Sequence, residues 1–393
     1  MVVATRPGRV LDHLQQHRED LVGLCEQLVA IESPSDDPGA TRLVLERLTS
    51  EFHGLGYRCR LSPPNKSGGY LYARPRHHPR GARAQLILGH ADTVWPMGTL
   101  AARPWTIDGP HAHGPGIFDM KAGLVQIIFA LRTLQDLGLE PPATPLVLIN
   151  TDEEIGSRES RRAIERLSRL ACRAFVCEPG LGPCGALKTA RKGLGRYTVT
   201  VHGRAAHAGL DPEGGASAIL ELSSVIQQLF ALNDRDRDIT VNVGTIEGGI
   251  QPNVIAPHSQ AVVDVRVLND TDATHVDSAI HAITPVTEGT TISVSGSFGR
   301  PPMIRTPGNA DLYEQAQDIG GELGLKIREV TAGGGSDGNT TSQHAPTLDG
   351  LGIIGDGAHA PSEHIDIASF APRTALLAAL LMQPVNGVWK DAT

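Results

Sequence analysis

Aromatic side chains are scarce in this sequence and make up 4% of its 393 residues. So few rings leave little material for the stacking platforms that bind single-stranded nucleic acids. An excess of basic charge is missing too, because the formal net charge is −8 and the sequence pI is about 6.0. Phosphate backbones and anionic membrane surfaces attract basic proteins. The composition therefore predicts neither a nucleic-acid nor a membrane partner, and an anionic substrate would need arginines placed at its own site.

Long hydrophobic runs are absent as well. The N-terminal stretch lacks the apolar segment of a secretory signal, and the apolar run at 375–382 is far too short to cross a bilayer. The 5 cysteines are odd in number and unpatterned, which favours reduced thiols over a disulfide framework. Cys177 and Cys184 flank Glu178 and could be ligands, but buried structural thiols are the simpler interpretation. These features predict a cytoplasmic protein.

The chain is long enough for two domains, because 393 residues exceed one ordinary hydrophobic core. In its first half, short apolar runs alternate with segments of helical periodicity, after predicted helices at 9–31 and 40–56. Continuous apolar strands between helices indicate a mostly parallel sheet that is covered by helices on both faces. The predicted strands are 85–89, 145–150 and 174–177, and the predicted helices between them are 119–138 and 157–168.

The pattern changes near residue 190. From there to about 300, strands and helices follow the order β-α-β-β-α-β, which is that of a ferredoxin-like unit. After residue 308 the first pattern resumes, so the α+β unit is predicted to be an insertion. We therefore expect a catalytic α/β domain built from residues 1–189 and 302–393, with a lid domain at 190–301.

Side chains that bind metals follow the three predicted strands of the first domain. His90 and Asp92 follow the first strand, Asp152, Glu153 and Glu154 the second, and Glu178 the third. In open α/β sheets, ligands bind beyond the carboxyl ends of the strands, so these groups should converge. Asp119 opens a helix, where a carboxylate is favoured by the helix dipole and, taken alone, is most simply a cap.

The composition of this set indicates the kind of metal. Imidazole and carboxylate ligands without cysteine suit zinc, or cobalt and manganese, in a hydrolytic site. One bridging carboxylate with two further ligands on each ion would make a two-metal centre. Such a centre needs a second histidine. His359 is the candidate, although most of the 16 histidines are expected at the surface.

Motifs spread over residues 85–365 resemble those of one zinc metallopeptidase family. This family includes glutamate carboxypeptidase, acetylornithine deacetylase, succinyl-diaminopimelate desuccinylase and aminoacylase. The sequence looks most similar to the glutamate carboxypeptidase branch, through DTVWPMGTL, GPGIFDMK and HAGLDPEGGASAILE. The segments that carry the resemblance are, in order, GHADTVWPMGTL, HGPGIFDMKAG, TDEEIGS, CEPG, RAAHAG, QPNVIAP, GGGSDGN and AHAPSEH.

The resemblance implies a ligand for each position of a two-zinc centre. Asp119 would bridge the ions, His90 and Glu178 would complete one shell, and Glu154 and His359 would complete the other. In AHAPSEH the family pattern places the ligand four residues before a glutamate, which selects His359 over His364. The family also has a cis peptide after the bridging aspartate, here between Asp119 and Met120.

Two more acidic residues receive catalytic roles from the same resemblance. Asp92 matches the aspartate that orients the metal-bound imidazole, and a loop cap is the alternative interpretation of its position. Glu153 matches the general base, which takes a proton from water and returns it to the departing amine.

The lid would supply substrate recognition. Valines at 263, 265 and 267 share one face of a predicted strand, so Arg266 lies on the other, where it could be an ordinary surface residue. The resemblance implies that Arg266 clamps the substrate carboxylate, for which guanidinium geometry is well suited, and that Asn253 assists. His207 would stabilise the oxyanion, and in dimeric members it comes from the partner subunit. Gly335 and Ser336 would belong to a substrate-facing loop, or simply to a flexible one.

Together these features predict a two-zinc hydrolase that cleaves an amide or peptide bond next to a free carboxylate and releases a C-terminal amino acid such as glutamate. The alternatives are an N-acyl-amino-acid deacylase and a small dipeptidase, which would share all the ligands. A metal-binding protein without catalysis is a distant alternative, because it should have lost Glu153. The substrate would be a small N-acyl amino acid or peptide, and a homodimer through the lid is expected.

Overall fold

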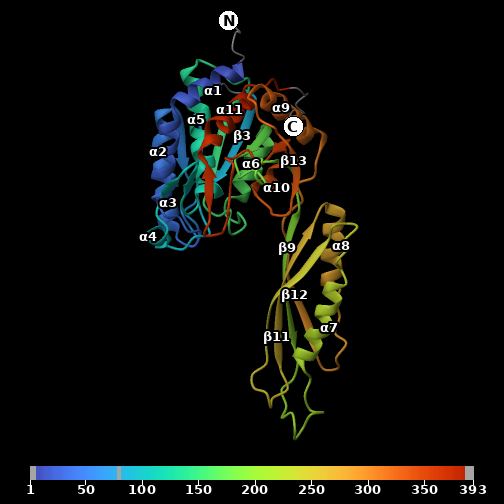
Figure 1. Cartoon of the computed structure of the whole chain (residues 1–393). Coiled ribbons are helices and arrows are strands. Elements are labelled where there is room, and N and C mark those ends of the chain that lie inside the picture. Colours follow the sequence, from blue (N-terminus) through green and yellow to red (C-terminus); the bar gives the residue numbers. More distant parts are fainter. Residues whose placement is uncertain (1–5, 78–80, 386–393) are drawn as a thin grey trace. The chain divides into compact units, whose positions relative to one another are not determined.

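The computed structural model describes residues 6–77 and 81–385. The chain divides into two compact units, which are described separately below (Figure 1). The first comprises Met1–Thr189, Arg305–Thr331 and Ser336–Thr393, and the second comprises Ala190–Ile304 and Ala332–Gly335. The second unit is thus an insertion in the sequence of the first.

The first unit is built on a six-stranded sheet with the order β1-β2-β6-β3-β7-β14. Strands β6, β3, β7 and β14 run parallel, while β2 pairs antiparallel with both β1 and β6. Every residue of β3 is buried, as expected of a parallel strand covered on both faces. The mostly parallel α/β sheet is confirmed. The strands are β1 Tyr57–Leu61, β2 Tyr70–Pro75, β3 Ala84–His90, β6 Thr144–Asn150, β7 Ala171–Val176 and β14 Thr347–Leu348.

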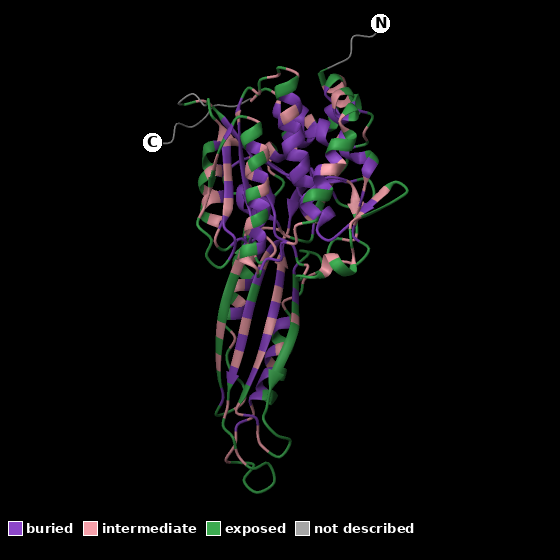
Figure 2. Cartoon of the chain, turned by 90° about the vertical axis from the view of Figure 1, so that its left-hand side faces the viewer, coloured by how far each residue is buried: buried purple, intermediate pink, exposed green. Residues whose placement is uncertain are grey.

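Helices surround this sheet, and the most buried of them are α5 and α11 (Figures 1 and 2). The predicted helix at 9–31 is divided, because His17 leaves the helical region with φ −102° and ψ 20°. The predicted helix at 119–138 begins with an irregular turn, η1, before regular α5. The helices are α1 Arg6–Gln16, α2 Arg18–Val29, α3 Pro38–Gly54, α4 Thr99–Ala102, η1 Ile117–Lys121, α5 Ala122–Asp136, α6 Arg161–Leu170, α9 Pro307–Glu322, α10 Asp337–Thr341, η2 Ile367–Ser369 and α11 Phe370–Leu381.

Two small sheets complete the framework. One is antiparallel with the order β15-β16-β5-β4, and the other pairs β8 with β13. The chain passes from the first unit into the second within β8. The strands are β4 Thr106–Asp108, β5 His111–His113, β8 Leu187–Arg191, β13 Glu329–Ala332, β15 Gly355–Asp356 and β16 His364–Asp366.

The second unit has the ferredoxin-like order β9-α7-β10-β11-α8-β12. Its antiparallel sheet has the order β10-β11-β9-β12, and buried positions alternate with more exposed ones along β9 and β11. Figure 2 shows this alternation as purple bands on the strands. Val263, Val265 and Val267 of β11 are buried in the core with α7 and α8. The elements are β9 Gly193–His202, α7 Ala218–Phe230, β10 Thr240–Gly248, β11 His258–Val267, α8 Asp270–His281 and β12 Thr291–Arg300.

None of the helices within 6–77 and 81–385 combines the length and the apolar character that a membrane span requires.

Candidate metal centre

The carboxyl ends of three adjacent strands bring the predicted ligands together. Strand β3 ends at His90, and its neighbours β6 and β7 lead into the loops that carry Glu153, Glu154 and Glu178. Because the three strands run parallel, their ends meet at one edge of the sheet. Nε2 of His90 lies 3.3 Å from Oε1 of Glu178.

Asp119 faces both histidines of the cluster. Its Oδ1 lies 3.1 Å from Nε2 of His90, and its Oδ2 lies 3.4 Å from Nε2 of His359. On the far side, Nε2 of His359 lies 3.3 Å from Oε2 of Glu154. The Asp119–Met120 peptide is cis, as the resemblance implies. The two carboxylate oxygens of Asp119 are thus directed to two different sets of ligands.

Local backbone features hold these side chains in place. Gly123, near the start of α5, lies so close to the end of β7 that any side chain there would collide with the carbonyl oxygen of Cys177. Glycine at this position therefore allows the start of α5 to approach the end of β7 closely. His359 has a φ of 60°, a left-handed conformation that non-glycine residues adopt mainly where the surrounding structure enforces it.

Asp92 connects the two halves of the cluster. It is fully buried, and its Oδ1 lies 3.4 Å from Nδ1 of His90. Its carboxylate also accepts hydrogen bonds from the backbone N–H groups of Glu153 and Glu154 and from the hydroxyl of Ser35. Asp92 thereby fixes both the imidazole and the loop after β6. Asp152 does not join the cluster, because it accepts hydrogen bonds from the N–H groups of Glu159 and Ser160.

The charges of the cluster are strongly interdependent. Burial opposes a charge on His90, but hydrogen bonds to Asp119 and its neighbouring carboxylates raise its pKa well above the ordinary value. Hydrogen bonds to Asp119 and Glu154 raise the pKa of His359 to about 10. Burial raises the pKa of Glu154 to about 7, against the opposing hydrogen bond from His359. Protons on the histidines therefore balance the carboxylates where bound cations would otherwise do so.

This donor set fits a pair of divalent cations. Two groups of described residues, His90–Asp119–Glu154 and His90–Glu153–Glu178, each have ligand atoms within 4.8 Å of one another. Oε1 of Glu154 is buried and lacks a hydrogen-bond partner among the described residues, so it is an acceptor that a cation would satisfy. Imidazole and carboxylate ligands of this kind suit zinc, cobalt or manganese.

Glu363 is a residue of this site to which the sequence analysis gave no role. It is 2% exposed, and its carboxylate accepts hydrogen bonds from the N–H groups of Gly116, Phe118 and Asp119 and from the indole of Trp95. It therefore holds the loop of the predicted bridging aspartate. The only signal in the sequence was its spacing of four residues after His359.

Ser336 lies in the interior of the first unit, not on its surface. Its side chain is fully buried, where it caps α10 by accepting a hydrogen bond from the N–H of Gly338 and donates to Asp349 at 2.5 Å. The hydroxyl thus has a structural role in this conformation. Gly335 belongs to the short 332–335 segment of the second unit.

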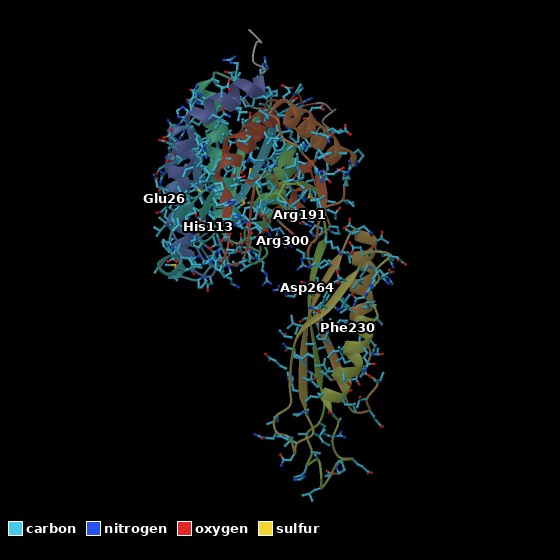
Figure 3. All side chains as sticks on the ribbon, in the orientation of Figure 1. Glu26, His113, Arg191, Phe230, Asp264 and Arg300 are labelled. Carbon is cyan, nitrogen blue, oxygen red and sulfur yellow. The ribbon has the colours of Figure 1, made fainter. Side chains whose placement is uncertain are left out.

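Arginines of the second unit hold that segment. Arg266 on β11 donates to the carbonyl of Gly333 at 2.8 Å and to Asp264 at 2.9 Å, and Arg191 donates to the carbonyl of Gly334 at 2.9 Å. Figure 3 labels Asp264 and Arg191. The Arg266 side chain is 34% exposed, so part of the guanidinium remains accessible beside its internal partners.

His207 and Asn253 lie in adjoining loops of the second unit. The N–H of Ala208 donates to the carbonyl of Asn253 at 3.0 Å, and both His207 and Asn253 are exposed. Nδ1 of His207 accepts hydrogen bonds from the N–H groups of Gly209 and Leu210. These bonds engage Nδ1 of the ring and not Nε2.

Comparison with known proteins adds a family and several relatives. The model of "Peptidase family M20/M25/M40" matches residues 86–383. Carboxypeptidase G2 of Pseudomonas sp. (strain RS-16) is 29% identical over 370 residues, which cover 91% of this chain and 87% of that protein. Acetylornithine deacetylase of Proteus mirabilis (strain HI4320) is 25% identical over 387 residues, covering 92% of this chain and 95% of that protein.

Solved structures agree with this at the level of the fold. Aminopeptidase PepT from Bacillus cereus ATCC 10987 superposes with a TM-score of 0.77 at 24% identity, covering 93% of this chain and 98% of that one. The metallo-carboxypeptidase Sso-CP2 from Sulfolobus solfataricus gives a TM-score of 0.72 at 18% identity, covering 92% and 98%.

Proposed function

Because this chain belongs to peptidase family M20/M25/M40, we propose that it is a two-zinc hydrolase that cleaves an amide or peptide bond next to a free carboxylate. A single observation carries the proposal. The two oxygens of Asp119 face two separate histidines, and each histidine has a further carboxylate within 3.3 Å, Glu178 in one case and Glu154 in the other. This arrangement supplies a bridging ligand and two terminal ligands for each ion.

The residues of the cluster divide the chemistry among themselves. Two bound zinc ions would polarise the scissile carbonyl and lower the pKa of water. Glu153 accepts the proton of the attacking water and passes it to the departing amine. Asp92 keeps the ring of His90 oriented through its Nδ1 side. Glu363 keeps the Asp119 loop in position through the backbone N–H groups that it accepts.

For the substrate, we propose an N-acyl or peptidyl amino acid with a free carboxylate, and glutamate as the released residue. Arg266 would bind the carboxylate through the exposed part of its guanidinium, with Asn253 and the 335–336 backbone completing the contact. The similarity to carboxypeptidase G2 supports this choice over the alternatives.

The second candidate is an N-acyl-amino-acid deacylase, in which the same centre removes an acyl group. The similarity to acetylornithine deacetylase favours it. A hydrolysis screen separates the two: zinc-loaded protein is given acyl- and peptidyl-glutamates beside N-acetyl and N-succinyl derivatives of basic amino acids. Release of glutamate at a much higher kcat/KM supports the carboxypeptidase. The reverse preference would support the deacylase, and turnover of neither class would contradict the proposal.

We also propose a two-fold symmetric homodimer in which each second unit lends His207 to the partner's site. Exposed edge strands such as β10 and β12 are natural pairing surfaces. Mixing inactive His207→Ala and Glu153→Ala proteins tests this, because one site of each heterodimer would contain both intact residues. Recovery of activity on subunit exchange is expected. Native mass measurement shows whether the subunits have exchanged. If they have exchanged and activity is still not recovered, donation between subunits is refuted.

For the compartment, we propose the cytoplasm. All of the cysteines (Cys25, Cys59, Cys172, Cys177 and Cys184) are free thiols, as is usual where glutathione and thioredoxin keep proteins reduced. Burial raises the pKa of Cys25 and Cys177, which keeps these thiols protonated and unreactive.

A further inference from the structure

Three histidines gather on the small β15-β16-β5-β4 sheet, apart from the ligands of the candidate centre. His111 and His113 lie on β5, and His364 opens β16. His364 pairs directly with His113 in the antiparallel register, so both side chains leave the same face of the sheet. His111 shares that face because it is two residues from His113. The register therefore creates a cluster from residues that are far apart in sequence.

Two of the three ring spacings are close to those of ligands around one ion, and the third is wider. The centroid of His364 lies 4.7 Å from that of His111 and 5.4 Å from that of His113, and the latter two are 6.4 Å apart. Three imidazoles on one tetrahedral zinc, with Zn–N bonds of about 2.0 Å, have centroids about 5 Å apart. In the present side-chain positions, the ligand atoms of this triad do not all lie within 4.8 Å of one another, unlike those of the two groups in the candidate centre. Closure on an ion thus requires rotation of the partly exposed rings between staggered positions.

The nitrogen atoms of two of the rings are arranged in a way that suits metal binding. Nδ1 of His364 lies 2.9 Å from the carbonyl oxygen of Ser362, and a proton held there leaves the lone pair of Nε2 available. Nδ1 of His111 is buried and lacks a hydrogen-bond partner among the described residues. A buried nitrogen without a partner is unfavourable, and an ion would provide that partner.

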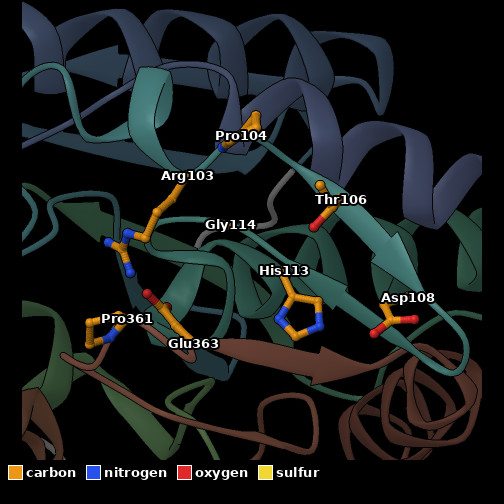
Figure 4. Close-up of a pocket in the computed structure, with 8 residues that line it drawn as sticks. All are labelled: Arg103, Pro104, Thr106, Asp108, His113, Gly114, Pro361 and Glu363. Atoms are coloured by element: carbon orange, nitrogen blue, oxygen red, sulfur yellow. The ribbon is translucent and has the colours of Figure 1, made fainter.

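Carboxylates and open space adjoin the triad. His111 is paired with Asp108 on one side and with Asp366 on the other, and their negative charge favours a cation. His113 and Asp108 also line a cavity of about 350 Å³ (Figure 4), which gives an ion and its water ligands a path of entry. Arg103 lines the same cavity, where its guanidinium stacks over the ring of Trp95 at 3.8 Å.

We propose that His111, His113 and His364 form a third metal site, separate from the two-ion centre, that binds zinc or a similar divalent transition metal through imidazole nitrogens. A bound ion would clamp β5 to β16. Strand β16 directly follows Glu363, whose carboxylate holds the Asp119 loop. Occupancy of the triad would therefore stabilise the part of the first unit that carries the candidate centre.

A calorimetric titration tests the proposal. Protein carrying two tightly bound zinc ions is freed of excess metal and titrated with zinc at about pH 7.5, where imidazole is neutral. The intact protein should bind one further equivalent. In His113→Ala and in His364→Ala the affinity for this further zinc ion should fall by on the order of 100-fold or more. Both tightly bound ions should be retained. The further equivalent should also disappear near pH 5.5, because protons then compete for the imidazoles.

His258→Ala is the matched control. His258 pairs with His202 across β11 and β9, with ring centroids 5.4 Å apart, and should leave the further equivalent unchanged. His111→Ala serves as a second variant if either triad substitution lowers the melting temperature in chelator. Absence of the further equivalent in the intact protein, its persistence in the triad variants, or its loss in His258→Ala would each overturn the proposal.

Discussion

Replacing Glu153 by Gln should stop turnover and leave the metal content intact. Glutamine keeps the volume and polarity of the side chain but cannot accept the proton of the attacking water. Glu153 has ligand atoms near His90 and Glu178, whereas Glu154 is the residue in contact with His359 at 3.3 Å. Both residues belong to groups that could hold a metal ion, so substituting each in turn tests the proposal that Glu153 is the proton acceptor and Glu154 the ligand.

The expected loss follows from the role of a general base. Removing such a base costs about 10²- to 10⁴-fold in rate, which corresponds to about 3–5 kcal/mol of transition-state stabilisation. Since the proton moves only in the transition state, kcat and kcat/KM should fall together.

Initial rates on an acyl- or peptidyl-glutamate, combined with elemental analysis of dialysed protein, measure both quantities. Glu154→Gln is the matched control: it removes a carboxylate oxygen that faces His359, so it should lose about one of two zinc ions. Loss of zinc in Glu153→Gln, or retention of more than about a tenth of kcat, would show that the two roles are wrongly assigned.

The remaining predictions concern the substrate clamp, the protons of the centre and the core. Arg266→Ala should weaken hydrolysis of substrates with a free α-carboxylate by orders of magnitude more than that of their primary amides, because a charge-assisted clamp is lost; equal losses in kcat/KM for both would make Arg266 structural. Zinc uptake by the metal-free protein at about pH 8 should release protons, because His359, with a pKa near 10, must lose its proton to bind a metal; calorimetry in buffers of different ionisation enthalpy measures this, and a buffer-independent heat would contradict it. By the same shift, protonated His359 stabilises the metal-free protein most below its ordinary pKa of 6.5, and this contribution should be lost as the pH rises through about 10; a melting temperature that does not fall over this range would argue against it. Arg373→Met should lower the unfolding free energy of the first unit by about 3 kcal/mol or more, because the buried guanidinium donates to the carbonyls of Gly185, Gly350 and Gly352; an unchanged urea midpoint would refute this.

Much of the fold was predictable because its signals are local. Continuous apolar runs between helices indicated parallel, covered strands, and β3 and β6 have that character. Alternation along β9 and β11 indicated the half-covered sheet of the insertion. The break at His17 was missed because leucines keep their helical spacing on both sides of it, so the apolar pattern does not register a change of backbone angle at one residue.

The amino-acid sequence by itself determined which side chains stand at the ends of the strands, since the residue types and their order are properties of the chain. Only the tertiary structure decided their geometry: that the two oxygens of Asp119 face His90 and His359, and that Glu363 holds the Asp119 loop. The contacts of Asp119 with His359 and Glu363 join segments separated by more than two hundred residues. The strand register that brings His364 beside His113 is likewise set by packing and hydrogen bonding across the sheet, and such long-range pairings leave no periodic trace in the sequence.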